Sequence, residues 1–137
     1  MKAQLISNYN TKYAIEGYEN INIADIIVDN SLDEILCINY ISYLNTKNLN
    51  DIINRIIGFL RKGGKVTFCD LDIILVCSKI SDGVISSDYN QYFQYRNNYH
   101  THGDILNLLE SKQDIIIETV RINEITNEYE IICKREL

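Results

Sequence analysis

Four polar residues follow two apolar runs in the middle of the chain, and their types and positions could do chemistry. Asn39 and Tyr40 follow the run Ile35–Ile38, and Asp70 and Asp72 stand at the end of the run Val66–Leu71. In open parallel α/β sheets, ligands bind outside the carboxyl ends of the strands. A carboxylate there can act as a general base or hold a substrate hydroxyl. We therefore take these four residues as candidate catalytic residues.

Each candidate also has a structural explanation. A tyrosine after a buried strand can close the edge of the core. An aspartate at a strand end is a common turn residue and helix cap. The sequence leaves both interpretations open.

A second cluster, His100-x-His102-x-Asp104, has a spacing that could suit zinc. No further histidine or nearby cysteine completes a ligand shell, so we predict no metal site. Thr101 is better explained as a helix cap, with both histidines solvated.

Tyrosines recur at three- and four-residue spacing before this cluster, at Tyr89, Tyr92, Tyr95 and Tyr99. This spacing predicts a helix face packed on a sheet. An aromatic surface that binds a sugar or a protein is the alternative.

The clearest helix is predicted over residues 47–60, where apolar residues recur every three or four positions. Asn45 or Thr46 is expected to cap its start, and Gly63–Gly64 to end it. Strands are expected at 35–38 and 66–71, and unbroken apolar runs suit central parallel strands. A strand, a helix and a strand with short joints predict a right-handed parallel crossover.

The other elements follow from shorter patterns. Strands are expected at 2–7 and 19–23, helices at 73–80 and 101–109, and a closing strand pair at 115–122 and 129–133, with a turn at 123–127. At 137 residues, with no linker or repeat, the chain is expected to form one domain over 1–137.

Composition limits the function. The net charge of −6 disfavours general nucleic-acid binding. The four cysteines form no C-x-x-C pair, and Cys37, Cys69 and Cys133 lie in apolar runs, so we expect buried thiols and a cytoplasmic protein. No segment reaches the length needed to span a membrane, so no membrane association is expected.

Five segments, in this order, carry a resemblance to a known family: Gly17–Ile23, Asn30–Ile35, Arg61–Lys65, Cys69–Asp72 and His100–Leu109. The chain resembles short class I S-adenosylmethionine (SAM) dependent methyltransferases, of a group often encoded beside surface-polysaccharide genes. The resemblance implies a Rossmann-like α/β fold: a mostly parallel sheet with helices on both faces and an antiparallel strand near the C-terminus.

The resemblance also implies a cofactor site, which would use Ser7, Asn8, Asn22 and Asp29. Three departures fall in that site. Ser7–Asn10 replaces the family's glycine turn, Asn22 replaces an acid that holds the ribose hydroxyls, and the loop before Asn30 is nearly absent. A side chain at Tyr9 would compete with the close approach of a ligand to the backbone.

The resemblance therefore predicts a reduced methyltransferase homologue in which SAM binding is weak or lost. If the chain is active, its substrate would be a small molecule or a glycan. The alternative is a non-catalytic pseudo-enzyme that binds a partner or stabilises another subunit. We also expect a homo-oligomer, because the lost loop should uncover apolar surface.

Overall fold

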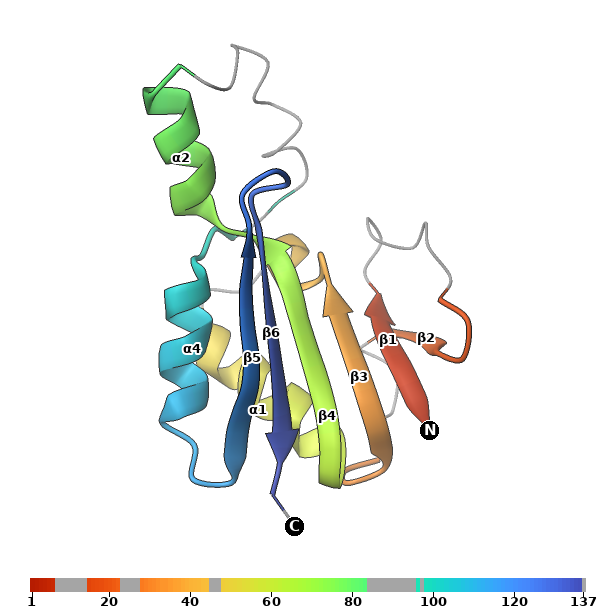
Figure 1. The fold of residues 1–137 in the computed structure, drawn as a ribbon. Coiled ribbons are helices and arrows are strands. Elements are labelled where there is room, and N and C mark those ends of the chain that lie inside the picture. Colours follow the sequence, from red (N-terminus) through yellow and green to blue (C-terminus); the bar gives the residue numbers. More distant parts are fainter. Residues whose placement is uncertain (7–14, 23–27, 45–47, 84–95, 97, 137) are drawn as a thin grey trace.

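The computed structural model contains one six-stranded mixed sheet (Figure 1). It describes residues 1–6, 15–22, 28–44, 48–83, 96 and 98–136. The strands are β1 (Lys2–Ile6), β2 (Glu19–Asn22), β3 (Leu32–Ile38), β4 (Leu60–Leu71), β5 (Ile115–Asn123) and β6 (Glu128–Arg135). Their order across the sheet is β2-β1-β3-β4-β6-β5.

The first four strands in this order are parallel, and the last two add an antiparallel hairpin. The predicted Rossmann-like α/β fold with a C-terminal antiparallel strand is thereby confirmed. Because β1 to β4 run the same way, their carboxyl ends meet at one edge, which is the upper edge in Figure 1. We call this the carboxyl edge.

Two helices pack side by side on one face of the sheet (Figure 1). They are α1 (Leu49–Phe59) and α4 (His102–Glu110). The α1 side chains Ile53 and Ile56 are fully buried, and they form one core with Val66 and Phe68 of β4. A second helix layer was predicted on the other face, but residues 7–14 and 23–27 of the connections around β2 lie outside the described part.

The start of α1 differs from the prediction. Its N-cap is Asn48, whose side chain accepts a hydrogen bond from the backbone of Asp51 at 3.2 Å. Asn45 and Thr46, the expected caps, precede it and lie outside the described residues.

The predicted Gly63–Gly64 helix stop is wrong. The helix ends at Phe59, and β4 begins at once with Leu60. The pairing of β3 with β4 is irregular where Leu32 pairs with Leu60 and Glu34 with Lys65. The glycines therefore lie at an irregularity inside a long strand, and Gly63 adopts a φ of 83° there.

The C-terminal elements follow the prediction closely. Thr101 caps α4, and Asp104 returns a hydrogen bond to the backbone of Thr101, so a full capping box is present. Three of the cysteines are in strands: Cys37 and Cys133 are buried, and Cys69 is partly exposed.

Helix α2 (Ile73–Ser81) begins at the carboxyl edge and projects beyond the sheet (Figure 1). Val76 is its only buried residue, and Ile74 is 61% exposed. Of the four spaced tyrosines, Tyr89, Tyr92 and Tyr95 lie outside the described residues. Tyr99 is 51% exposed and does not pack in the core as predicted. No helix in the described residues is long and apolar enough to cross a membrane.

Candidate functional site

Three of the predicted polar residues lie along the carboxyl edge, at the ends of different strands. Asn22 is the last residue of β2 and pairs with Ile6 at the end of β1. Asn39 follows β3, and Asp70 lies near the end of β4. Ser7 and Asn8 follow β1 directly, but they lie outside the described residues.

Asp29 is not part of this group. It precedes β3, and the backbone N–H groups of Asn30 and Ser31 donate to carbonyls at the C-terminal end of α1. Asp29 Oδ1 lies 4.0 Å from the position a Cβ would take on Gly58. The chain returns to the amino edge before a parallel strand can begin. The structure therefore places Asp29 at the opposite edge from Asn22 and Asn39.

Asp70 is buried, with 1% exposure, and its carboxylate is fully engaged. The Ser42 backbone N–H donates to Oδ2 at 3.0 Å, and the Ser42 hydroxyl donates to Oδ1 at 2.8 Å. Oδ1 also accepts from the Leu71 backbone at 2.7 Å. Ser42 belongs to the short helix η1 (Ile41–Tyr43), so Asp70 fastens that turn to the end of β4.

Tyr40 is fully buried at the start of this turn. Its ring belongs to the hydrophobic core, as the structural explanation of this residue proposed.

Asp72 joins two helix N-termini. As the N-cap of α2, its Oδ1 accepts from Ile74 at 2.9 Å. Its Oδ2 accepts from the His102 backbone at 3.0 Å and lies 2.6 Å from His102 Nδ1. Burial acts to raise the pKa of Asp72, but these hydrogen bonds outweigh it and lower the pKa. An ionised Asp72 thus holds α2 and α4 together.

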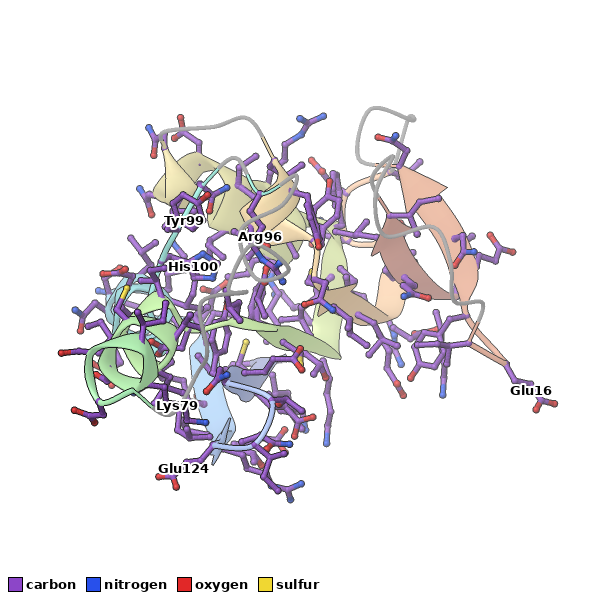
Figure 2. The ribbon with its side chains drawn as sticks, turned by 90° about the horizontal axis from the view of Figure 1, so that it is seen from above. Glu16, Lys79, Arg96, Tyr99, His100 and Glu124 are labelled. Atoms are coloured by element: carbon purple, nitrogen blue, oxygen red, sulfur yellow. The ribbon has the colours of Figure 1, made fainter. Side chains whose placement is uncertain are left out.

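His100 is buried with 2% exposure, and the prediction of two solvated histidines is therefore wrong. Its Nε2 lies 2.5 Å from the Tyr129 hydroxyl, and its Nδ1 lies 3.3 Å from Asn98 Oδ1. A neutral imidazole satisfies both contacts, by donating to Asn98 and accepting from Tyr129. In Figure 2, which looks down on the carboxyl edge, His100 and Arg96 lie near the middle of the molecule.

Asn39 is the candidate that structural contacts explain least. Its backbone is left-handed, with φ of 49°, and its N–H donates to the Cys69 carbonyl at 2.8 Å. Its side-chain Oδ1 is buried without a hydrogen-bond partner in the described part of the chain. A buried amide oxygen without a partner is costly unless a ligand or water satisfies it.

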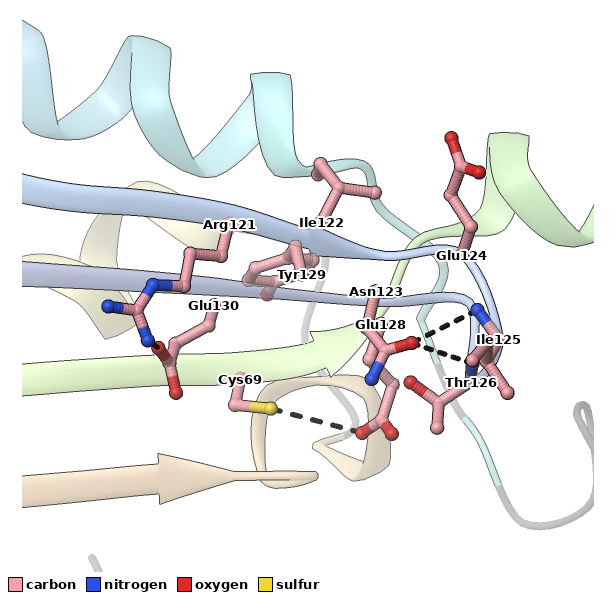
Figure 3. A pocket seen from close by; sticks show the side chains of 10 residues that line it. All are labelled: Cys69, Arg121, Ile122, Asn123, Glu124, Ile125, Thr126, Glu128, Tyr129 and Glu130. Carbon is pink, nitrogen blue, oxygen red and sulfur yellow. Dashed lines mark hydrogen bonds and ion pairs between the residues drawn. The ribbon is translucent and has the colours of Figure 1, made fainter.

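An open pocket of about 640 Å³ lies around the β5–β6 hairpin (Figure 3). Its wall includes Cys69 of β4 and several hairpin residues: Arg121, Glu124, Glu128, Tyr129 and Glu130. The sequence interpretation missed these residues. The pattern of a strand pair with a turn gave the hairpin, but nothing in it indicated a pocket.

The arrangement defines a class of fold. Parallel strands followed by an antiparallel C-terminal hairpin, with polar groups at the carboxyl edge, form an open Rossmann-like α/β sheet. No family model and no curated protein matches this sequence.

Solved structures do match the fold. A SAM-dependent methyltransferase from Methanosarcina mazei has a TM-score of 0.57 and 15% identity, over 88% of this chain and 67% of its own. A protein from Pyrococcus horikoshii has a TM-score of 0.62 and 15% identity, over 88% of this chain and 60% of its own.

A third match is the 1,6-didemethyltoxoflavin-N1-methyltransferase of Burkholderia thailandensis, solved with 1,6-didemethyltoxoflavin and S-adenosylhomocysteine bound. It has a TM-score of 0.56 and 10% identity, over 88% of this chain and 52% of its own. The chain thus has the fold of class I SAM-dependent methyltransferases, and it spans about half to two thirds of these three proteins.

Asn22 stands where the resemblance expects a ribose-binding acid, and Asn39 Oδ1, at the same edge, is a buried acceptor without a hydrogen-bond partner in the described part of the chain. When bound, SAM would supply an electrophilic methyl group.

Proposed function

We propose that this chain is a reduced SAM-dependent methyltransferase homologue. We call the part of the sheet from β3 to β6 the acceptor side, because it would face the methyl acceptor, and the part with β1 and β2 the donor side. In this proposal the acceptor side is retained, and SAM binding at the donor side is weak or lost. The observation that supports it is the unequal size of the two sides of the sheet.

The acceptor side has complete elements. Helix α1 joins β3 to β4, and α2 and α4 precede the β5–β6 hairpin. On the donor side, β1 and β2 are separated by residues 7–18, and β2 and β3 by residues 23–31. A parallel crossover with a helix needs about a dozen residues or more. The first connection has about this minimum length, and the second is shorter.

Charge also weakens the donor side. An amide at Asn22 makes weaker hydrogen bonds to ribose hydroxyls than a carboxylate would, by about 1 kcal/mol. We therefore expect a dissociation constant for SAM above about 100 µM, or a binding free energy no better than about −5.5 kcal/mol.

Calorimetric titration with SAM and S-adenosylhomocysteine tests this proposal. The wild type should bind above about 100 µM, and Asn22→Asp should bind about fivefold more tightly, the equivalent of about 1 kcal/mol. Asn20→Asp is the matched control on the same strand and should not change affinity. Micromolar binding by the wild type would contradict a weakened site.

A non-catalytic pseudo-enzyme that binds a partner is the second candidate function. The observation that favours it is exposed apolar surface near the carboxyl edge, where Ile74 is 61% and Ile125 is 90% exposed. Failure of the Asn22→Asp variant to bind SAM would favour this candidate.

A further inference from the structure

The pocket around the β5–β6 hairpin has the place and size of a small-molecule site. Small-molecule sites occupy about 300–1,000 Å³, and the pocket measures about 640 Å³. Cys69, near the carboxyl end of β4, contributes to its wall. Ligands of open α/β sheets lie outside these strand ends.

Carboxylates dominate the pocket's charge. Glu130 faces Arg121 at 3.7 Å, so these two charges offset each other. Glu128 has no cationic partner among the described residues, and its carboxylate accepts a weak hydrogen bond from the Cys69 thiol at 3.9 Å (Figure 3). Glu124 also lines the pocket, but its carboxylate points away from that of Glu128 (Figure 3).

The thiol of Cys69 reports the sign of the potential at the pocket wall. Burial is the largest cause that raises its pKa to about 12, and the negative charges of Glu128, Asp70 and Glu130 add to it. A site that disfavours a thiolate through neighbouring carboxylates favours a cation.

We propose that this pocket binds the methyl acceptor and that the acceptor is a small molecule with a protonated amine, separate from the nucleophilic atom that would take the methyl group. The role of the ligand as a methyl acceptor rests on the proposed function, but binding of the ligand can be measured separately. Glu128 is the residue that would face the cation.

The test is a nuclear magnetic resonance titration of the full chain with three four-carbon probes: putrescine, butanediol and succinate. Putrescine should give saturable shifts at Cys69 and Glu128, and the neutral and anionic probes should not. Glu128→Gln should raise the dissociation constant for putrescine about threefold, the effect of losing one partly exposed charge pair.

Glu110→Gln is the matched control, because the substitution makes the same change in net charge. Glu110 is exposed and lies at the C-terminal end of α4. Equal weakening by both variants would show general attraction to an acidic protein and overturn the inference. So would the absence of saturable shifts with putrescine, or equal shifts with succinate.

The titration is independent of the SAM measurement. Putrescine binding together with a failure of Asn22→Asp to bind SAM would keep the cation site and favour the pseudo-enzyme candidate. Tighter SAM binding by Asn22→Asp without saturable putrescine shifts would keep the methyltransferase proposal and overturn the cation site.

Discussion

At the residue scale, the two histidines of the His100-x-His102 cluster lie in different surroundings. His100 lies inside the protein against Tyr129, whereas the His102 side chain is 39% exposed and is held by Asp72. Burial is the largest effect on His100 and lowers its pKa. Asp70, Asp104 and Asp72 act to raise it, and Arg96 acts with burial.

The lowered pKa of His100 predicts a pH dependence of stability. The pKa of His100 is lower in the folded than in the unfolded protein, so the unfolded state binds a proton first as pH falls. The stabilising contribution is complete above the unfolded value of about 6.5 and is lost as pH falls below it. The free energy of unfolding should therefore be lower at about pH 5.5 than at about pH 7.5 through this group.

Urea unfolding of the wild type and His100→Gln at both pH values measures this contribution. All other titrating groups are shared, so the difference between the two proteins reports His100. A variant that loses as much stability as the wild type on acidification would show that His100 does not carry the effect.

At the scale of elements, the irregular start of β4 depends on one small residue. A Cβ on Gly64 would lie 2.9 Å from the Arg61 carbonyl oxygen, 3.0 Å from that of Asp33 and 3.1 Å from that of Leu32. All three atoms are backbone, so they cannot move aside cheaply. The glycine allows β3 and β4 to stay paired across the irregularity.

Gly64→Ala should therefore destabilise the protein by about 1–3 kcal/mol, the usual cost of forcing extra atoms into a packed site. Gly103→Ala is the control, because a Cβ there would meet only the Thr101 Oγ1 at 3.5 Å, in a helix where alanine is preferred. Thermal unfolding of both variants tests this. A neutral Gly64→Ala would mean that the strands shift register without cost.

At the scale of the whole molecule, the sheet is well covered by α1 and α4 on one face, while apolar side chains remain exposed elsewhere. Among the described residues, the most exposed large apolar side chains are Ile125 on the hairpin, Val28 before β3, and Ile74 on α2. Exposed apolar residues that cluster in patches often mark interfaces.

We expect a homodimer or larger assembly that uses α2. Light scattering at roughly millimolar concentration, where weak pairs form, should show it. Ile74→Glu should shift the protein toward monomer. Ile116→Glu, on β5 and 46% exposed, should leave the assembly intact. A wild type that stays monomeric at this concentration would rule out self-association.

The sequence by itself determined the order of the elements. Buried apolar runs indicated β3 and β4, and helical periodicity placed α1 within two residues at each end. The Thr101 cap and the hairpin also followed from local chemistry, because caps and turns depend on residues close in the chain.

Only the tertiary structure decided what the polar residues do. Asp70, Asp72 and His100 looked alike as candidates for catalysis or exposure, but their roles come from partners at least 28 residues away: Ser42, His102 and Tyr129. The position of Asp29 at one edge of the sheet likewise depends on the direction of β3. The pocket forms where the hairpin meets β4. Local patterns carry no information on such contacts, because strand pairing brings distant segments together.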